Sequence, residues 1–334
     1  KTVTFTGNVT VVTDDLVVLG ESTGNSYVAW RREVTRLTNI LVALDGSELA
    51  ERALPPALAL AQKHHSQLVL VRAAEAHTLP GTDQSEPQIS AVNEAEAYLS
   101  TMATRLNIPS DRLQTAVPYG ETTSSILLEI QLRKADLVVM STHGRNGIGR
   151  AVLGSIAAGV INAATVPVLV IPPQATNSIP NRPLHVLVAT DGSDRAAAVV
   201  PDVVNLVQEG RITLLRALSP SPARVMGSVQ TTTQSEDGAL EHDLEHLRAN
   251  FEVDSVVIDI QTAQGEPAMV IRAKAEELGA DVIAISTHGR TGAPRLIMGS
   301  VAEALMSSAT VPLLIRHPNF QEHKGGHEIG RAHV

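Results

Sequence analysis

The feature that most constrains this chain is an internal repeat that runs through most of its length. Three blocks recur in the same order, the first after 146 residues and the other two after 145. A period this long indicates a duplicated domain, because the repeats of solenoid proteins span only about 20–45 residues. The blocks are ILVALDGSE (40–48) and VLVATDGSD (186–194), ADLVVMSTHGR (135–145) and ADVIAISTHGR (280–290), and LGSIAAGVINAATVPVLVI (153–171) and MGSVAEALMSSATVPLLIR (298–316).

The repeat sets the expected division of the 334 residues. Two domains, 36–173 and 184–317, agree with the usual size of about 150 residues per domain. The stretch PPQATNSIPNRP at 172–183 is polar and holds four prolines, so residues 174–183 are predicted to be an exposed linker. Residues 1–35 form an N-terminal extension, and residues 318–334 are expected to be a flexible tail.

Each copy alternates short apolar runs with helical stretches. The runs are rich in Val, Ile and Leu without strict polar alternation, which is typical of strands covered on both faces. Strand and helix alternation predicts an α/β fold with an open parallel sheet and right-handed crossovers, so ligands are expected beyond the carboxyl ends of the strands. In the first copy the strands are expected at 40–44, 68–71, 113–117, 137–140 and 166–171, with helices at 48–64 and 122–134.

Composition excludes several classes of function. The net charge of −9 disfavours binding to phosphate backbones, and 2% aromatic residues disfavour a base-stacking surface, so no nucleic acid is expected. The absence of cysteine excludes disulfides and thiolate metal sites, and it fits a cytoplasmic location. Apolar runs fall short of the roughly 18 residues that span a bilayer, and no signal peptide follows Lys1, so no membrane association is expected.

Two polar segments interrupt the alternation at equivalent places after the second strand of each copy. Residues 78–91 and 219–239 are rich in Ser, Thr, Pro and Gly. Such segments are either mobile surface loops or lids over a site, and both alternatives stay open.

The two ends of the chain lie outside the repeat. Residues 2–12 alternate Thr with apolar residues around Gly7-Asn8, which predicts a β-hairpin with a two-residue turn. The C-terminal region carries His317, His323, His327 and His333 near two glycines. A metal site needs ligands held in fixed geometry, so no metal site is predicted there.

A glycine pattern recurs after the fourth strand of each copy. In the first copy, Ser141-Thr-His-Gly144 is followed by nine residues and then by Gly154-Ser155. Glycine lets the backbone approach a ligand closely, and free N–H groups at a helix start favour phosphate. A simple turn is the alternative, but two matches with identical spacing favour phosphate binding. In the second copy the same positions are Ser286, Gly289, Gly299 and Ser300.

Other nucleotide and catalytic motifs are missing from the sequence. The P-loop needs Gly-Lys-Ser or Gly-Lys-Thr, and neither occurs. In the dinucleotide pattern GxGxxG, the last position after Gly147 and Gly149 is Val152. The sequence also contains neither GxSxG nor HExxH.

A second element follows the first strand of each copy, where Asp45-Gly-Ser47 and Asp191-Gly-Ser193 stand at the same place. The serines are good N-caps for the next helix. An aspartate at the carboxyl end of a strand can take a ribose hydroxyl or help hold Mg²⁺, whereas the alternative is a plain turn aspartate. Its repetition favours the ligand interpretation.

The glycine segments also carry histidines and arginines. A catalytic histidine needs a partner that orients it, and the sequence identifies none, so His143 and His288 are expected to lie beside phosphates through their backbone. The arginines either reach phosphates or remain solvated. They are Arg145, Arg150, Arg290 and Arg295.

Together, the Ser-Thr-His-Gly segment, its nine-residue spacing to Gly-Ser, the following ATVPVLVI and the early VALDGSE resemble the universal stress protein family. The resemblance covers residues 36–173 and 184–317, as in a tandem two-domain member. The family fingerprint for ATP is Gly-x-x-Gly, nine residues, then Gly-(Ser/Thr). This chain departs from it at the first glycine, where Ser141 and Ser286 stand.

The resemblance implies a five-stranded parallel sheet in each domain, with helices on both faces and ATP, with or without Mg²⁺, across the strand ends. It places Asp45 and Asp191 against the nucleotide, and the backbone of Ala73 and Ala217 against adenine. Family members commonly pair through the last strand. The resemblance therefore implies an intramolecular pseudo-dimer through residues 166–171 and 311–316, with a homodimer as a further alternative.

Two classes of function remain open. One is an ATP-binding stress-response or signalling protein whose nucleotide occupancy regulates its conformation or the binding of a partner protein. The other is a slow Mg²⁺-dependent ATPase or nucleotide hydrolase. The lack of an evident base or nucleophile favours the first. Related enzymes that adenylate their substrates carry a Ser-Gly-Gly-x-Asp-Ser loop, which DGSE does not match.

Overall fold

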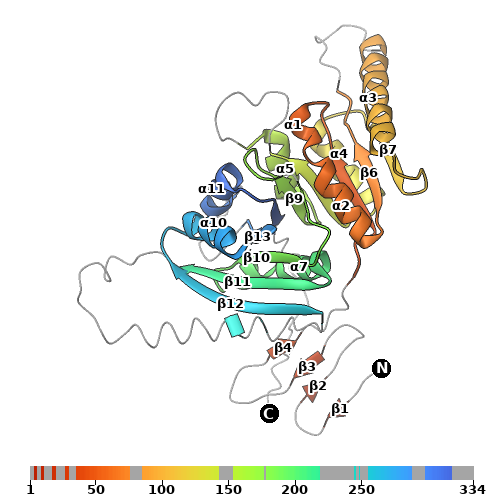
Figure 1. Cartoon of the computed structure of the whole chain (residues 1–334). Helices are drawn as coiled ribbons and strands as arrows, with labels where there is room; N and C mark the ends of the chain where they lie inside the picture. Colours follow the sequence, from red (N-terminus) through yellow and green to blue (C-terminus); the bar gives the residue numbers. More distant parts are fainter. Residues whose placement is uncertain are drawn as a thin grey trace, which may run out of the picture.

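The computed structural model describes residues 35–75, 85–142, 153–176, 178–218, 255–287 and 298–317, together with 244, 245, 248 and the backbone of four short strands before residue 35 (Figure 1). The first half of the protein contains β5 (Asn39–Ala43), α1 (Glu48–Glu51), α2 (Leu54–His64), β6 (Gln67–Val71), α3 (Ser85–Leu106), β7 (Leu113–Ala116), α4 (Thr122–Leu132), β8 (Leu137–Ser141), α5 (Ser155–Ala163) and β9 (Val168–Ile171). The second half contains β10 (Leu184–Ala189), α6 (Asp194–Ala197), α7 (Val200–Val207), β11 (Gly210–Leu218), β12 (Val256–Gln264), α10 (Pro267–Leu278), β13 (Val282–Ser286), α11 (Ser300–Ser308) and β14 (Leu313–Arg316).

Ten of the strands form one sheet, in the order β12-β11-β10-β13-β14-β9-β8-β5-β6-β7. Within each half all neighbouring strands are parallel, which confirms the predicted α/β class. In both halves the first strand lies between the second and the fourth. The chain therefore reverses its direction of winding between β5 and β8, and between β10 and β13. Ligands of open α/β sheets bind beyond the carboxyl ends of the strands at such a point, which is called the crevice of each half below.

The two halves meet through their last strands. β14 pairs antiparallel with β9, with Leu314 opposite Leu169 in the middle of the junction, and both side chains are fully buried. The last strands of the two halves therefore pair within one chain, and the pairing is antiparallel. The parallel strands of one half run in the opposite direction to those of the other half. The carboxyl ends of the two sets therefore lie at opposite ends of the strands in the continuous sheet.

Two further hydrogen bonds reinforce this junction at equivalent positions of the repeat. The carbonyl oxygen of Thr165, just before β9, accepts from Nη1 of Arg316 at 2.9 Å. The carbonyl oxygen of Thr310, just before β14, accepts from the N–H of Thr176 at 2.8 Å. One contact thus joins the second half to the first, and the other joins the linker residue Thr176 to the second half.

Helices cover both faces of the sheet, and both hydrophobic cores extend across the junction. On one face, α2, α3 and α7 pack with side chains such as Leu169 and Leu314. On the other face, α4, α5, α10 and α11 pack with Val168, Val170 and Leu313. The sheet twists strongly between β6 and β11 (Figure 1), as expected for ten strands that each rotate by about 20°.

The twist brings the amino ends of the strands of both halves together on the face that α2 and α7 cover. Nε2 of His64, at the end of α2, lies 3.1 Å from the carbonyl oxygen of Leu206 in α7. The N–H of Thr35 donates to Oδ1 of Asn205 at 3.0 Å. Burial lowers the pKa of His64 to about 4, so its imidazole is neutral at physiological pH.

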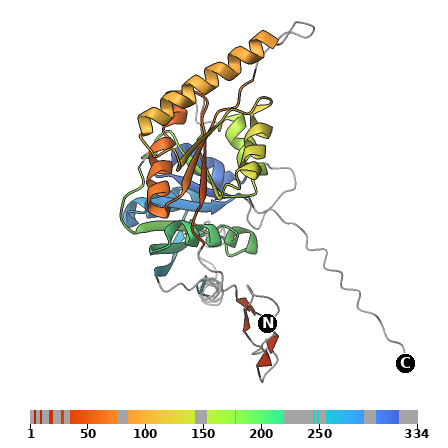
Figure 2. The ribbon, with the colours of Figure 1, turned by 90° about the vertical axis from the view of Figure 1, so that its right-hand side faces the viewer.

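The structure changes the expectation for the polar segment after the second strand of the first half. Residues 85–91, assigned above to a polar loop, begin the 22-residue helix α3, which extends past the strands in Figure 2. The reason is the run of helix formers that follows, with Ala95, Leu99 and Met102 on one buried face. The rest of that segment up to residue 84, and all of 219–239, lie outside the described residues.

The linker between the halves is also less exposed than its prolines and polar residues predict. Ala175 and Ile179 are buried, and Ile179 packs in the hydrophobic core that both halves share. Arg52, the residue that ends α1, donates to the carbonyl oxygens of Pro173 and Ala175, each at 2.5 Å. The linker is therefore fixed to the first half by a guanidinium.

At the N-terminus, β1 (Thr4–Phe5) and β2 (Val9–Thr10) pair antiparallel, with Phe5 opposite Val9. Three residues rather than two separate the paired positions. A second pair, β3 (Val17–Leu19) with β4 (Tyr27–Ala29), was not expected. Among the residues that the structure describes, no helix is long and apolar enough to span a membrane.

Candidate functional site

The first crevice begins where β5 ends. Asp45 follows the strand, Gly46 takes a φ of 87°, and Ser47 is the N-cap of α1. Oδ1 of Asp45 accepts from the backbone N–H of Ser47 at 2.9 Å and from its hydroxyl at 2.7 Å. Oγ of Ser47 then accepts from the N–H of Ala50 at 3.1 Å. One carboxylate oxygen thus holds the turn and the start of the helix together.

The second crevice repeats this arrangement. Oδ1 of Asp191 accepts from the N–H of Ser193 at 2.9 Å and from its hydroxyl at 2.6 Å. Oγ of Ser193 accepts from the N–H of Ala196 at 3.2 Å, and Gly192 has a φ of 79°. The predicted N-cap role of both serines is confirmed, and each aspartate holds its turn through Oδ1.

The backbone polar groups of Ala73 face away from β7. The N–H of Arg72 donates to Ala116 and the N–H of Ala74 donates to Pro118, so both point toward β7. Because successive residues of an extended strand point their polar groups to opposite sides, the N–H and C=O of Ala73 face the end of β5. This direction is toward Asp45.

Ala217 has the same place at the end of β11. The N–H of Thr190 donates to the carbonyl of Leu215 at 3.0 Å, just as that of Leu44 donates to Val71 at 2.8 Å. Ala217 lies two residues after Leu215, as Ala73 lies two residues after Val71. Both alanines are half-buried.

The second glycine of each pattern closes a loop onto the end of the fourth strand. The N–H of Gly154 donates to the carbonyl of Thr142, and that of Gly299 donates to Thr287, both at 2.9 Å. A Cβ at these glycines would lie 3.0 and 2.8 Å from the same carbonyl oxygens. Glycine is therefore required by a backbone contact, and its N–H, which we had expected to face a phosphate, is already donated within the protein.

The helices that follow these glycines begin with an exposed serine. Ser155 and Ser300 are exposed at the first position of α5 and α11. Within the described part of the chain, no side chain caps either helix. The first N–H groups of a helix have no partner inside it, and the dipole makes this end attractive to anions.

The remaining predicted residues differ in what the structure gives for them. Ser141 ends β8 and is half-buried. Ser286 ends β13, is buried, and donates its hydroxyl to the carbonyl of Ala196 at 3.2 Å. The residues predicted in the glycine segments lie outside the described residues. They are His143, Gly144, Arg145, Arg150, His288, Gly289, Arg290 and Arg295.

Two glutamates at the crevices were missed by the sequence analysis. Glu121 is the N-cap of α4 and accepts from the N–H groups of Thr123 and Ser124 at 3.0 and 2.7 Å. Hydrogen bonds from the side chain and then the backbone of Ser124, and from Thr123, lower the pKa of Glu121 to about 2. Glu266 caps α10 in the same way through Met269. The repeated Gly-Glu at 120–121 and 265–266 was the available signal.

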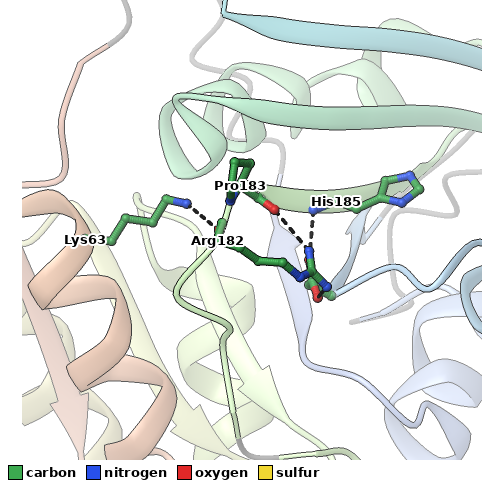
Figure 3. A network of polar contacts seen from close by, with 5 residues as sticks. Lys63, Arg182, Pro183 and His185 are labelled. Atoms are coloured by element: carbon green, nitrogen blue, oxygen red, sulfur yellow. Dashed lines mark hydrogen bonds and ion pairs between the residues drawn. The ribbon is translucent and has the colours of Figure 1, made fainter.

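A repeated aspartate fixes the opposite ends of the strands. Oδ2 of Asp136 accepts from the N–H groups of Thr38 and Asn39 and from the Thr38 hydroxyl. In the second half, Asp281 accepts from the N–H of His185 at 2.9 Å and pairs with both Nη atoms of Arg182 (Figure 3). The Ala-Asp pair that recurs at 135–136 and 280–281 therefore stabilises the fold through its aspartate.

Polar contacts fix α3 beside the first crevice. Arg72 is buried, pairs with Glu94 at 2.5 Å and lies 5.0 Å above the ring of Tyr98. Glu51 of α1 accepts from the hydroxyl of Tyr98 and pairs with Arg105. Burial and the adjacent Glu51 raise the pKa of Tyr98 to about 12. The helices α1 and α3 are thus joined by polar contacts.

No group of three or more metal-ligating side chains occurs among the residues that the structure describes. The crevices therefore consist of turn aspartates, strand-end backbone and helix starts with an exposed serine. A twisted parallel sheet with these elements at its points of reversal defines the protein as a tandem doubly wound α/β protein.

Comparison with known proteins specifies the family. The sequence profile of the universal stress protein family matches twice, over residues 37–172 and 184–317. The chain therefore belongs to the universal stress protein family, as a tandem two-domain member.

Individual relatives agree with this assignment. A putative universal stress protein of Staphylococcus aureus strain USA300 is 27% identical over 139 residues, which cover 40% of this chain and 82% of that protein. The crystal structure of a universal stress protein from Archaeoglobus fulgidus matches with a TM-score of 0.61 and 20% identity, over 84% of this chain and 98% of that one. One from Pseudomonas aeruginosa UCBPP-PA14 matches with a TM-score of 0.55 and 18% identity, over 84% and 93%. At these identities the structures support the fold alone.

Proposed function

We propose that each half of this protein binds an adenine nucleotide, ATP, at the carboxyl ends of its strands, and that occupancy regulates the conformation or partner binding of a stress-response protein. The observation that carries the proposal is that one arrangement occurs twice. In each half an Asp-Gly-Ser turn, a strand-end alanine and an uncapped helix start surround the point of reversal of the sheet.

Each part of the arrangement fits one part of the nucleotide. The carboxylates of Asp45 and Asp191 suit a ribose hydroxyl, since a carboxylate is a hydrogen-bond acceptor at a strand end. The N–H and C=O of Ala73 and Ala217 offer the donor and acceptor that pair with the edge of adenine.

Phosphate recognition falls to the helix starts. The hydroxyls of Ser155 and Ser300, with the first N–H groups of α5 and α11, suit phosphate oxygens. We further propose that Ser141, Gly144 and Arg145 contribute from the glycine segment of the first half. The corresponding contacts in the second half are Ser286, Gly289 and Arg290, and His143 and His288 lie beside the phosphates through their backbone. Mg²⁺, when bound with ATP, would neutralise charge between the phosphates.

The proposal favours a regulatory ligand over a rapidly consumed substrate. Backbone N–H groups, serine hydroxyls and glycines bind phosphate without activating water. General-base catalysis needs a side chain held by an orienting partner, and the carboxylates of Asp45 and Asp191 are instead committed to turns through Oδ1.

Calorimetric titration of the full chain with ATP tests the proposal. Two sites are expected, Gly144→Glu should remove one and Gly289→Glu the other, because a carboxylate would occupy the phosphate position. Ser100→Glu, which adds the same charge on the exposed side of α3, is the matched control and should keep both sites. ATP at a hundredfold excess over Kd should raise the free energy of unfolding by about 2.7 kcal/mol. A full chain with a single site would contradict the two-site proposal.

Turnover separates the two classes of function. ATP hydrolysis should be far slower than the rate of about 1 per second that is ordinary for enzymes. His143→Ala combined with His288→Ala should leave ATP affinity unchanged. Turnover in the enzyme range that this double variant abolishes would favour the nucleotide-hydrolase function instead.

A further inference from the structure

The two halves differ in a side chain that lies behind the phosphate end of the second crevice. Thr287 follows β13 and is 1% exposed. Its N–H donates to the carbonyl of Arg316 in β14, and its carbonyl accepts from Gly299, the N-cap of α11, both at 2.9 Å. Thr287 therefore joins the fourth strand, the fifth strand and the helix start.

The side chain of Thr287 is held from the fifth strand. Its Oγ1 shares a hydrogen bond of 2.9 Å with Nδ1 of His317, the residue that follows β14. His317 is half-buried. The hydrogen bond with His317 fixes the rotamer of the buried Thr287 side chain. Because the carbonyl of Thr287 accepts from Gly299, the same bond also fixes the position of Gly299 and Ser300.

The first half has the same backbone contacts without this side chain. Thr142 is equally buried, and its carbonyl accepts from Gly154 at 2.9 Å. The residue after β9, however, is Pro172, which has no polar side chain. The N–H of Thr142 is also 3.4 Å from the carbonyl of Ile171, longer than the corresponding 2.9 Å at Thr287.

We infer that His317 is a positioning residue for the phosphate end of the second site, and Pro172 stands at its place in the first half. This inference rests on the proposed nucleotide function. The imidazole does not contact the ligand; it holds Thr287, which in turn holds the start of α11.

The test measures the second site alone, in the full chain carrying Gly144→Glu. His317→Ala should weaken ATP binding by about three- to tenfold, the effect of one neutral hydrogen bond. Binding of adenosine, which has no phosphate, should change by less than about twofold. His317→Asn should restore ATP affinity, because its amide can take the place of Nδ1.

The matched control is Pro172→Ala in the full chain carrying Gly289→Glu, where ATP affinity of the first site should not change. A second measurement does not depend on ligand. The amide proton of Gly299 should exchange about three- to tenfold faster in His317→Ala, and that of Gly154 should not. If His317→Ala fails to fold, His317→Gln keeps the size of the side chain and replaces it in both measurements.

Two results would overturn the inference. One is unchanged ATP affinity and unchanged Gly299 exchange in the folded variant. The other is an equal loss of ATP and adenosine binding, which would indicate general damage to the second half. If the parent chain carrying Gly144→Glu binds no ATP at all, the proposed function fails at that site, and the exchange of Gly299 still decides whether His317 positions the helix start.

Discussion

In the first half, α1 ends at Arg52, whose guanidinium holds the carbonyls of Pro173 and Ala175 in the linker. In the second half, the equivalent helix α6 ends at Ala198, which has no such group. The second half is instead reinforced at the fourth strand, where Ser286 and Thr287 are bonded to Ala196 and His317. The turns of the two crevices are the same, but the contacts that fix them come from different directions. Duplication has thus kept the backbone of the two turns and let the supporting side chains diverge.

The largest expected difference between the halves is at the start of their second strands. Gly210 has a φ of 138°, and a Cβ there would lie 2.2 Å from the carbonyl oxygen of Leu184. Gly210→Ala should therefore lower the free energy of unfolding by about 4 kcal/mol. The first half has Ser66 at this place, bonded to the carbonyl of Leu37. Ser66→Ala should lower it by only about 1 to 2 kcal/mol.

Urea unfolding of the two variants measures this difference. In the double variant the free energy of unfolding should fall by the sum of the two single losses, since the two positions lie in separate halves. Equal losses for the two single variants would show that the left-handed backbone of Gly210 tolerates a side chain.

The second expected effect is on pH dependence and originates in the first half. His64 is buried against Leu206, and its Nδ1 has no hydrogen-bond partner in the described structure. Its pKa is lowered from 6.5 to about 4, so the unfolded chain binds more protons between these values. The free energy of unfolding should fall as pH decreases through this window, by about 3 kcal/mol at most.

Urea unfolding at pH 7 and pH 4.5 tests this dependence. His64→Gln should flatten it, because the amide does not titrate. His185 is half-buried and its pKa is also lowered by burial, so it contributes with the same sign, and His185→Gln is the matched control. An acid dependence that survives in His64→Gln but disappears in His185→Gln would place the titrating group in the second half.

A smaller effect, equal in both halves, is expected from the helix caps. Ser47→Ala and Ser193→Ala each remove an N-cap with nearly the same geometry. Each should lower the free energy of unfolding by about 1 kcal/mol, measured by urea unfolding. A difference between them of more than about 1 kcal/mol would contradict the equivalence of the two turns.

The smallest effect concerns the network of Figure 3. Arg182 pairs with Asp281, but its side chain is 54% exposed. Arg182→Ala should lower the free energy of unfolding by about 1 kcal/mol or less, and the loss should shrink at high salt. In the first half, Thr38 makes the corresponding contact to Asp136 through an uncharged hydroxyl. The loss in Thr38→Ala should not depend on salt, and urea unfolding at two ionic strengths compares the pair.

The sheet was largely predictable, and particular residues show why. The expected run at 137–140 falls within β8, and that at 68–71 falls within β6. Strands covered on both faces consist of Val, Ile and Leu, so composition alone marks them. The junction of β9 with β14 was also predictable, because two equivalent apolar strands at the ends of the repeats would otherwise be open edges.

The supporting contacts could not be predicted. That the Gly154 N–H is donated to Thr142 depends on how an eleven-residue connection closes, which residue types alone do not determine. The burial of Ile179 depends on the hydrophobic core that both halves share, which forms only when the halves pack together. The link between Thr287 and His317 joins residues that are 30 positions apart and meet only because β13 and β14 are neighbours.

The junction between β9 and β14 also has a consequence for synthesis of the chain. β9 is complete about 145 residues before its partner, since Val168 pairs with Ile315. At about 5 to 20 residues per second, a nascent first half carries an unpaired edge of Val168, Leu169 and Val170 for roughly 7 to 30 seconds. During that time two nascent chains on one messenger can join through β9 before either has made β14. The spacing of ribosomes on the messenger RNA therefore affects which product forms. One product is a monomer in which β9 pairs with its own β14, and the other is a dimer in which β9 pairs with a second chain.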